Sequence, residues 1–394
     1  MPTTRTQIGI VGAGPAGLLL ARLLARDGID SIVVERRDRA YVIGRVRAGV
    51  LEQGTVDLLE AVDVGGRLRE QGLRHSGVQL AFEGRRHRID LAALTGGRAI
   101  TIYGQSEVVK DLLAAHDAAG QPIVFDAEDV HLENVASSMP SIHYRVAGVD
   151  HEIRCDFVAG CDGSHGVCRS AIPLSALTVY ERRYSFAWLG ILAEAPPTSD
   201  ELVYSRHARG FALFSMRSPS ITRLYLQCDP DEDLAQWSDD RLWDELLARL
   251  RTDDGWAPAI GPIVQKNIAS MRSVVLDPMQ YGRLYLAGDA AHVVPPTGAK
   301  GLNLAAADVW RLAAAFVAFY RSGAEDDLRT YSARGVRRAW WAQRFSWWMT
   351  STLHRDAGAG LFDERRQLAD LDYLVSSKAA MTSLAENYAG LPFA

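Results

Sequence analysis

The sequence predicts a mixed α/β fold (α+β overall), with an N-terminal α/β unit, an inserted β-sheet domain and a helical C-terminal region. Three stretches support this prediction. Residues 7–35 follow the order strand, glycine turn, helix, strand, and residues 211–228 alternate in polarity like a hairpin. After residue 301 the chain is rich in alanine and aromatic residues at helical spacing. Because 394 residues exceed what one ordinary core accommodates, we expect more than one domain.

The first elements surround a glycine-rich turn. We expect a strand at residues 8–11, a helix at 18–25 and a strand at 32–34. Gly12, Gly14 and Gly17 have the spacing G-x-G-x-x-G, and Glu35 closes the second strand. A Rossmann-like fingerprint places a ribose-binding acid there, about 20 residues beyond the glycines, and a pyrophosphate at the helix N-terminus. The stretch therefore predicts a dinucleotide site, and by itself it leaves NAD and FAD open.

Two later strand ends also carry a glycine beside a carboxylate. DFVAGCDGSHGVCRS contains Asp162, and RLYLAGDAAHVVPPTGAKGLNLAAADVW contains Asp289 before a helix expected to begin near Gly298. NAD needs one such site, whereas the ribityl chain and ring of FAD would use more. Asp289 can accept from ribityl hydroxyls, and the helix can point its positive end at a flavin ring. Arg45 and Arg47 can bind a pyrophosphate, although isolated surface arginines are often only solvated. We therefore expect FAD.

The stretch RGFALFSMRSPSITRLYLQCD reads as two strands around a polar turn. On the first strand Phe211, Leu213, Ser215 and Arg217 share a face, and on the second Arg223, Tyr225 and Gln227 do. If the hairpin register aligns these faces, the arginines and hydroxyls suit a small aromatic carboxylate. A solvated strand face would show the same alternation, so both interpretations stay open.

Composition and charge narrow the classes of protein. The net charge of −5 argues against a nucleic-acid partner. No apolar run reaches the roughly 20 residues of a membrane span, and the beginning of the sequence lacks a signal-peptide core, so we expect a cytoplasmic location. The four cysteines form no C-x-x-C pair, which predicts buried structural thiols and no metal site.

Four tryptophans lie between residues 340 and 348, in RRAWWAQRFSWWMTSTLHR. With the neighbouring phenylalanine and methionine they cover more than one helical face. Clustered aromatic side chains of this kind are typical of a core or of a protein interface.

Together these motifs resemble the flavoprotein aromatic hydroxylases. The resemblance rests on the glycine turn with Glu35, the Asp162–Gly163 turn and GDAAHVVPPTGAKGLNLA. Within the family, RAGVLEQGTVDLL, RGFALFSMRS, RFSWWMTS and AENYAGLP are similar to the members that act on 4-hydroxybenzoate, and the likeness runs from residue 7 to 393. It implies an FAD-binding domain at 1–72, 98–181 and 268–320, a substrate domain at 73–97 and 182–267, and a helical region at 321–394 that forms a homodimer interface.

The resemblance also implies which residues bind FAD. Glu35 would contact the ribose, Arg47 and Asp289 the pyrophosphate and ribityl chain, and Lys300 the flavin ring. The full expected set is Gly12, Gly14, Gly17, Glu35, Arg45, Arg47, Gln105, Asp162, Arg223, Asp289, Gly298, Lys300, Leu302 and Asn303.

For the substrate, the resemblance implies a carboxylate clamp and a phenol-binding end. The expected substrate residues are Tyr204, Ser215, Arg217, Tyr225, Pro296 and Tyr388, and the expected catalytic residues are Tyr204, Tyr388, Pro296 and His75. Tyr204 would bind the phenol, Tyr388 would extend that contact, and the carbonyl of Pro296 would face the hydroxylated edge. His75 would form the outer end of a proton path to solvent.

The implied reaction uses NAD(P)H and O2. A flavin C4a-hydroperoxide would hydroxylate 4-hydroxybenzoate at its 3-position and yield 3,4-dihydroxybenzoate. The expected coenzyme residues are Arg36, Arg37, Tyr41, Arg45, His165 and Arg272. The resemblance implies that Arg36 and Tyr41 favour the 2′-phosphate of NADPH, whereas repulsion from Asp38 opposes this preference and leaves NADH use open.

Three alternatives remain at this stage. The same chemistry could act on a related para-hydroxy or para-amino benzoate. A non-enzymatic escort protein of the same fold would keep the glycine turn without flavin. An FAD-dependent amine oxidase or dehydrogenase would reduce its flavin with substrate alone.

Overall fold

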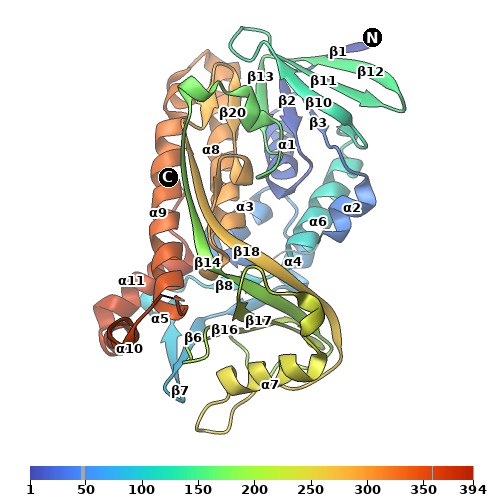
Figure 1. Ribbon diagram of the computed structural model, residues 1–394. Coiled ribbons are helices and arrows are strands. Elements are labelled where there is room, and N and C mark those ends of the chain that lie inside the picture. The colour runs from blue at the N-terminus through green and yellow to red at the C-terminus, as the bar shows by residue number, and fades with distance from the viewer. Residues whose placement is uncertain (46–48, 357, 394) are drawn as a thin grey trace.

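The computed structural model describes residues 1–45, 49–356 and 358–393. Its upper part in Figure 1 is built on a six-stranded sheet with the order β19-β20-β13-β2-β3-β9, parallel except for β19. The strands are β2 (Ile8–Val11), β3 (Ser31–Val34), β9 (Ile123–Val124), β13 (Phe157–Gly160), β19 (Gln280–Tyr281) and β20 (Leu284–Leu286). The helices α1 (Pro15–Arg26), α6 (Gln105–Ala118) and α8 (Gly301–Ser322) pack against it in one hydrophobic cluster.

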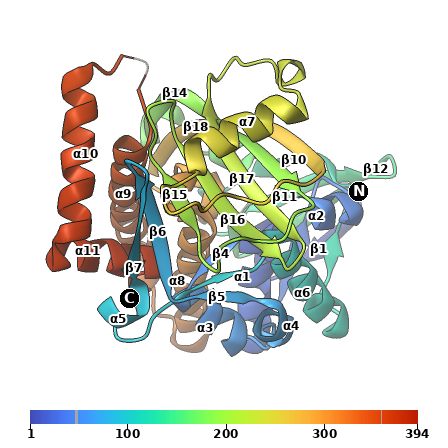
Figure 2. The ribbon, with the colours of Figure 1, turned by 90° about the horizontal axis from the view of Figure 1, so that it is seen from below.

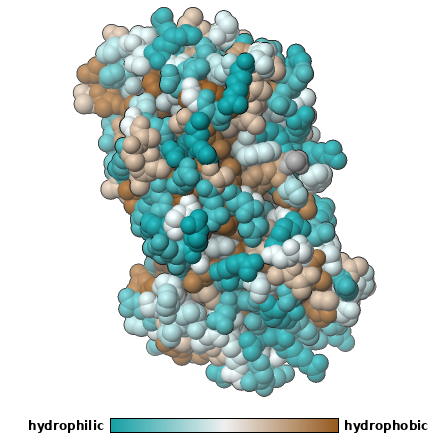
Figure 3. Space-filling view, turned by 180° about the vertical axis from the view of Figure 1, so that it is seen from behind, coloured by the Kyte–Doolittle hydropathy of each residue, from teal (hydrophilic) through white to brown (hydrophobic). Residues whose placement is uncertain are grey.

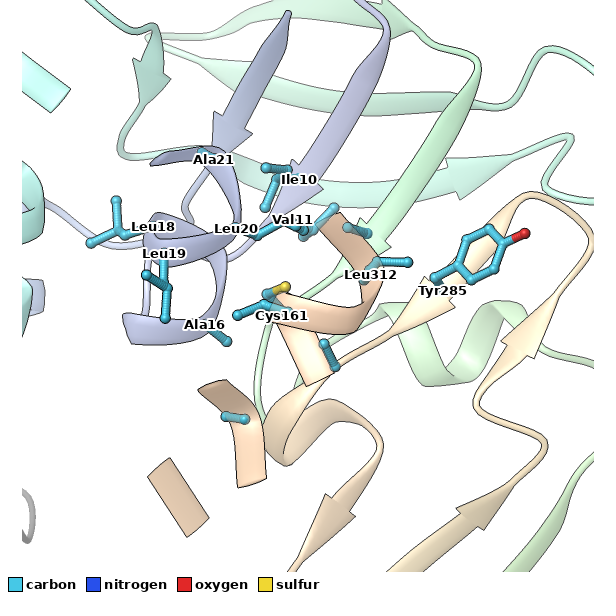
Figure 4. Packing of buried hydrophobic residues seen from close by; sticks show 14 of the residues in the cluster. Ile10, Val11, Ala16, Leu18, Leu19, Leu20, Ala21, Cys161, Tyr285 and Leu312 are labelled. Atoms are coloured by element: carbon cyan, nitrogen blue, oxygen red, sulfur yellow. The ribbon is translucent and has the colours of Figure 1, made fainter. Parts of the chain in front are cut away.

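The first elements agree with the sequence prediction because their buried positions are mainly apolar. All four residues of β2 are buried, as expected for a central parallel strand covered on both faces. Figure 4 shows Ile10 and Val11 beside the leucines of α1, with Leu312 of α8 close by. Helix α1 begins at Pro15, earlier than predicted, because proline is well accommodated in the first turn of a helix.

The lower part is an eight-stranded sheet with the order β21-β18-β14-β17-β16-β15-β6-β7. Its strands are β6 (Gly77–Phe82), β7 (Arg85–Asp90), β14 (Thr178–Ala193), β15 (Val203–Ser205), β16 (Ala212–Ser218), β17 (Ile221–Cys228), β18 (Ile263–Asp277) and β21 (His292–Val293). The predicted hairpin is confirmed as β16 and β17. Figure 1 shows the long antiparallel pair β14 and β18 running from the upper part to the lower. The predicted domain limits at 181–182 and 267–268 fall inside these two strands, and the domain division stays a prediction.

Helix α7 (Asp239–Leu250) covers one face of this sheet, as Figure 2 shows from below. The other face packs against the C-terminal helices α9 (Asp326–Leu353), α10 (Leu361–Ser376) and α11 (Lys378–Ala389). The substrate-side residues predicted from the hairpin lie on this second face, between the sheet and the helices.

Two smaller sheets complete the fold. One has the order β4-β8-β5, with β4 (Val50–Glu52), β8 (Ile100–Ile102) and β5 (Leu73–His75). The other has β1 (Thr3–Arg5), β12 (Val149–Arg154), β11 (Ser141–Val146) and β10 (Glu128–Glu133). The short helices are α2 (Arg39–Gly44), α3 (Gln53–Ala61), α4 (Gly66–Gln71) and α5 (Leu91–Leu94). The predicted fold class is therefore confirmed.

Helix α8 is long and apolar enough to cross a membrane by length and composition alone, but 67% of its apolar window is buried inside the protein. It is thus a core helix of this fold. The face of the molecule in Figure 3 is mainly hydrophilic, with scattered hydrophobic residues. All four cysteines are buried free thiols, as predicted.

Candidate active site

The glycine turn between β2 and α1 has the geometry of an anion site. Gly12 has φ +106°, and a Cβ there would lie 2.4 Å from the carbonyl oxygen of Cys161. In contrast, a Cβ on Gly14 would meet no atom within 4 Å, so this glycine borders open space. Because no side chain caps α1, its first N–H groups are available to a phosphate.

Glu35 lies at the end of β3, next to this turn. Its Oε2 accepts from the backbone N–H of Ala13 at 2.8 Å, and its Oε1 accepts from that of Arg37 at 2.9 Å. These bonds hold the carboxylate at the edge of the glycine turn, where the fingerprint requires an acceptor for a ribose.

The strand end after β13 holds two buried polar groups with unused atoms. Asp162 Oδ2 accepts from the backbone N–H of Cys168 at 2.8 Å, whereas its buried Oδ1 has no partner among the described residues. Burial raises the pKa of Asp162. Arg169 donates through Nη2 to the carbonyl oxygens of Asp289 (2.9 Å) and Ala290 (3.1 Å), which joins this strand end to the loop after β20. Sequence reasoning missed Arg169, although it stands in the quoted stretch around Asp162.

The loop after β20 differs from the prediction at the start of its helix. Helix α8 begins at Gly301, and a short 3-10 turn (Pro296–Gly298) and Ala299 with φ +54° precede it. A Cβ on Gly298 would lie 2.8 Å from Ser346 Oγ, so packing against α9 requires this glycine. The side chain of Asp289 and the ring of Pro296 are exposed, as groups that meet a ligand should be.

Lys300 and Asn303 connect the start of α8 to β4. The buried Lys300 Nζ lies 2.5 Å from Glu52 Oε1 and also donates to the carbonyl of Asn387. Burial lowers the pKa of Lys300, and the Glu52 carboxylate opposes this effect. Asn303 accepts from the backbone N–H of Glu52 at 2.9 Å and donates to the carbonyl of Val50 at 2.9 Å. Glu52 was not singled out from the sequence because its partner is distant in the chain.

The hairpin register brings the two predicted faces together. Leu213 is paired with Tyr225, and Ser215 with Arg223, so these side chains share one face of the sheet. Tyr204 on β15 is paired with Leu213 and extends the same row. The condition on which the predicted carboxylate site depended is therefore met.

Two arginines supply the positive charge of this face. Arg223 is buried, its guanidinium lies 5.0 Å from the ring centroid of Tyr225, and its Nε and Nη1 have no partner among the described residues. Arg217 is half-buried, and burial lowers its pKa to about 10. Since a buried guanidinium with unused donors is unfavourable, the arrangement favours an anionic ligand.

Tyr204 and Tyr388 form a buried hydroxyl pair. Their oxygens lie 2.5 Å apart, and Tyr204 also donates to the carbonyl oxygen of Thr297 at 3.2 Å. Burial raises the pKa of both tyrosines, so both are neutral at physiological pH. Strand β15 and helix α11, 184 positions apart in sequence, thus meet at one polar point.

His75 on β5 is buried, and its Nε2 lies 3.3 Å from Met216 Sδ. Burial lowers its pKa to about 4, and its Nδ1 has no partner in the part of the chain that the structure describes. The proton path from Tyr388 to His75 stays a prediction.

The predicted coenzyme residues are mostly exposed. The guanidinium of Arg37 lies 5.1 Å from the ring of Tyr41, and Asp38 caps α2 by accepting from the backbone N–H of Tyr41 at 2.6 Å. Arg36 and Arg45 are exposed. Two residues predicted to bind FAD lie at helix starts: Gln105 begins α6, and Leu302 lies in the first turn of α8. His165 bonds to Ser164 Oγ at 3.0 Å, and Arg272 is half-buried on β18. Arg47 lies outside the described residues.

Comparison with known proteins identifies the family. The family model described as "FAD binding domain" matches residues 5–346. The chain belongs to this FAD-binding family. It is 47% identical over 393 residues to the p-hydroxybenzoate hydroxylase of Acinetobacter baylyi, covering 100% of this chain and 97% of that protein. It is also 27% identical to a 3-(3-hydroxy-phenyl)propionate/3-hydroxycinnamic acid hydroxylase of Mycobacterium avium, over 78% of this chain and 55% of that one.

A solved structure shows the same fold across the whole chain. The p-nitrophenol 4-monooxygenase PnpA of Pseudomonas putida superimposes with a TM-score of 0.84 and covers 99% of both chains. At 19% sequence identity this likeness bears on the fold alone.

The residues around the glycine turn fit the FAD that the family binds. An uncapped helix N-terminus and the open space at Gly14 suit its pyrophosphate. The unpartnered Oδ1 of Asp162 and the exposed Asp289 offer acceptors to its hydroxyls. The expectation of FAD as cofactor is confirmed by the family, while the contact of each residue stays a prediction.

The tryptophan cluster of α9 is divided between core and surface. Phe345 and Met349 are buried at 3% and 2% exposure, but Trp340, Trp341 and Trp347 are 44%, 42% and 44% exposed. These three tryptophans are therefore not core residues of a single chain, and the interface remains the prediction that accounts for them.

Proposed function

We propose that this chain is an FAD-dependent monooxygenase that hydroxylates 4-hydroxybenzoate at the 3-position, with NADPH preferred over NADH as reductant. The relative from Acinetobacter baylyi supports the substrate, and the family supports the cofactor. The observation that carries the proposal is the sheet face on which Ser215, Arg223 and Tyr225 adjoin the Tyr204–Tyr388 hydroxyl pair. One end of this face suits a carboxylate and the other suits a phenol.

The carboxylate end would orient the ring. Arg217 would bind the substrate carboxylate through its guanidinium fork, and the hydroxyls of Ser215 and Tyr225 would complete the clamp. The two ends would fix the long axis of the ring, and a bidentate clamp on the planar carboxylate would fix the ring plane, so that one ring carbon ortho to the phenol would face the flavin side of the pocket. The carbonyl of Pro296 would lie at that edge.

The phenol end would activate the ring. A phenolate is a stronger nucleophile than a phenol at the carbon ortho to its oxygen. The substrate proton would pass to Tyr204 Oη while the proton of Tyr204 moves to Tyr388 Oη, and the short distance between these oxygens suits the transfer. Neither tyrosine has to ionise at rest, which agrees with their raised pKa values. His75 would receive the proton beyond Tyr388.

When bound, FAD supplies the redox chemistry by taking a hydride from the nicotinamide and activating O2. The chain contributes the exclusion of water around it. Trp188, Leu202 and Leu213 are buried at 3%, 1% and 5% exposure and line the sheet face beside the tyrosines.

We also propose a cytoplasmic homodimer, without a nucleic-acid or membrane partner, in which the exposed tryptophans of α9 lie at the interface. The product would be 3,4-dihydroxybenzoate. A non-enzymatic escort role would leave the arginine clamp and the buried tyrosine pair without a purpose, and an amine oxidase would not need a cationic clamp.

The first experiment measures NADPH oxidation by the FAD-loaded protein with and without 4-hydroxybenzoate, together with chromatography of the product. We expect stimulated oxidation and one 3,4-dihydroxybenzoate per NADPH. Stimulated oxidation that yields only hydrogen peroxide would show a ligand that is not the true substrate. No stimulation would contradict the assignment and lead to tests of 4-aminobenzoate and other para-substituted acids.

A further inference from the structure

His354 is a buried polar side chain that lies among the aromatic rings of Phe186, Trp188 and Phe211. It lies at the C-terminal end of α9, is 2% exposed and faces the sheet. Its ring stacks on Phe186 and on Phe211, with centroids 4.6 Å and 4.2 Å away. An imidazole in such a place needs partners for both nitrogens, or its burial is unfavourable.

Both nitrogens have partners, and they define the tautomer. The indole N–H of Trp188 donates to Nε2 at 2.6 Å, and Nδ1 donates to the carbonyl of Thr350 at 3.0 Å. Because an indole nitrogen can only donate, Nε2 carries no proton and the ring is neutral. Burial also lowers the pKa of His354, to about 3. The carbonyl of Thr350 additionally accepts from the backbone N–H of His354 at 3.0 Å, so among the described residues the polar group that depends on the imidazole is the indole N–H of Trp188.

Trp188 in turn supports a residue of the proposed carboxylate clamp. Its ring lies 4.8 Å from the ring of Tyr225. Gly190 is paired with Tyr225 on the neighbouring strand. A Cβ on Gly190 would lie 3.1 Å from the Tyr225 ring, so the absence of a side chain at Gly190 leaves space for this ring beside Trp188. Phe211, another ring that stacks on His354, has its centroid 6.1 Å from that of Tyr204, which belongs to the proposed phenol end.

The backbone beside His354 is attached to the same row of the sheet. Gln227, paired with Trp188, donates to the carbonyl of Arg355 at 2.5 Å and accepts from its N–H at 3.0 Å. The end of α9 is thus docked by two hydrogen bonds between the backbone of Arg355 and the side-chain amide of Gln227, and the His354 ring adds a separate bond to the indole.

We propose that His354 is a positioning residue for substrate binding, which orients the Trp188 indole and through it the Tyr225 hydroxyl. This inference rests on the proposed function, because it assigns His354 to the carboxylate clamp. His354 itself does not touch the substrate.

The test is a double-mutant cycle on the FAD-loaded protein, with variants His354→Phe, Trp188→Phe and the double variant. His354→Phe keeps an aromatic ring in the stack and removes the acceptor for the indole. It also removes the Nδ1 bond to the carbonyl of Thr350, but that carbonyl keeps the backbone N–H of residue 354 as a donor. We expect the Kd of 4-hydroxybenzoate, followed by the change in FAD absorption, to rise about tenfold, because the unpaired indole N–H would move toward another partner. In the Trp188→Phe background, the same substitution should change Kd less than twofold, since no donor remains to be satisfied.

Trp243→Phe is the matched control. It removes another buried indole bond, to the carbonyl of Gly261 at 3.1 Å, from the helix on the opposite face of the same sheet. This control should lower Tm and leave Kd unchanged. If His354→Phe also lowers Tm without changing Kd, or if its effect persists in the Trp188→Phe background, the inference is overturned. If wild-type protein does not bind 4-hydroxybenzoate, the proposed function fails instead, and the cycle is measured with the para-substituted benzoate that does bind.

Discussion

Two tyrosine hydroxyls meet in the interior of this protein, and the buried Lys300, whose charge is paired with Glu52, lies 5.9 Å from the ring of one of them, Tyr388. Tyr204 and Tyr388 are 2% and 1% exposed, and their short bond satisfies both groups in a place that water does not reach. Arg223, paired with Ser215, stands farther along the same face, and Arg217 follows at the register shift between Met216 and Ser218. Because the proposed relay is neutral and the proposed clamp is charged, we expect changes to their residues to have different effects.

Tyr388→Phe removes the second oxygen of the relay and keeps the ring. We expect kcat for 4-hydroxybenzoate hydroxylation to fall about a hundredfold, since Tyr204 keeps only the carbonyl of Thr297 as an acceptor, and a carbonyl cannot pass a proton on as the Tyr388 hydroxyl can. The Kd of the substrate should change less than threefold, because Tyr388 lies behind Tyr204. Tyr225→Phe is the comparison variant and should raise Kd more than it lowers kcat. Steady-state kinetics and substrate titration of both variants test this, and an unchanged kcat in Tyr388→Phe would contradict the relay.

At this scale the sequence predicted the groups on single strands but not their distant partners. Alternation placed Ser215, Arg223 and Tyr225 because side-chain direction repeats every two residues. Glu52 beside Lys300 and His354 beside Trp188 left no local signal, because each pair is separated by more than 150 residues and meets only through packing.

The strand–turn–helix element at the N-terminus contains glycines at positions where a side chain would occupy space needed by the backbone or by a ligand. Its glycines differ in role: the missing Cβ of Gly12 avoids a neighbouring backbone carbonyl, whereas the missing Cβ of Gly14 faces open space. The first is a requirement of the folded chain, and we expect the second to be a requirement of a bound phosphate.

Substituting these two glycines separates the requirements. Gly12→Ala has to accommodate φ +106° and a contact of 2.4 Å, so we expect the apoprotein to lose at least about 2 kcal/mol of unfolding free energy. Gly14→Ala should leave that free energy within about 0.5 kcal/mol of wild type, while FAD affinity falls because the methyl group occupies the phosphate approach. Urea unfolding of apoprotein and FAD titration measure the two quantities. Equal stability loss in both variants would argue against this assignment.

The stability of the whole molecule should depend on pH through buried histidines, among them His75 and His354. Burial lowers the pKa of His75 to about 4 and of His354 to about 3, below the unfolded value of 6.5. Between these values the unfolded chain binds protons that the folded chain excludes. Stability is therefore fully present above pH 6.5 and is lost as the pH falls, by about 1.4 kcal/mol per pH unit for each histidine.

His75→Phe tests this dependence. The variant should show roughly half of the wild-type slope that the two histidines contribute between pH 6 and 4, because one proton-binding site has been removed from the unfolded chain. Urea unfolding of the apoprotein at several pH values gives the slopes. Parallel curves for wild type and variant would contradict a neutral His75 in the folded state.

The three exposed tryptophans of α9 are proposed to lie at the interface of the homodimer. Replacing Trp341 and Trp347 by serine removes much of the exposed aromatic surface from this helix, so we expect the proposed dimer to dissociate into monomers at micromolar concentration. Sedimentation velocity measures the change. Phe362→Ser removes an aromatic residue that is 80% exposed on α10 and serves as the control. A wild-type protein that sediments as a monomer would contradict the proposed interface.

The sequence by itself determined the glycine turn with its acidic partner, the hairpin with its polar face and the mixed α/β class, because these depend on local periodicity and on the backbone freedom of glycine. The meeting of two hydroxyls from β15 and α11 was implied only by the family resemblance and has no local signal in the sequence. Only the tertiary structure decided that Arg169 connects two strand ends and that Gly298 serves the packing of α9. These features arise where segments far apart in the chain share one packed interior, and their geometry follows from the layers of sheet and helix.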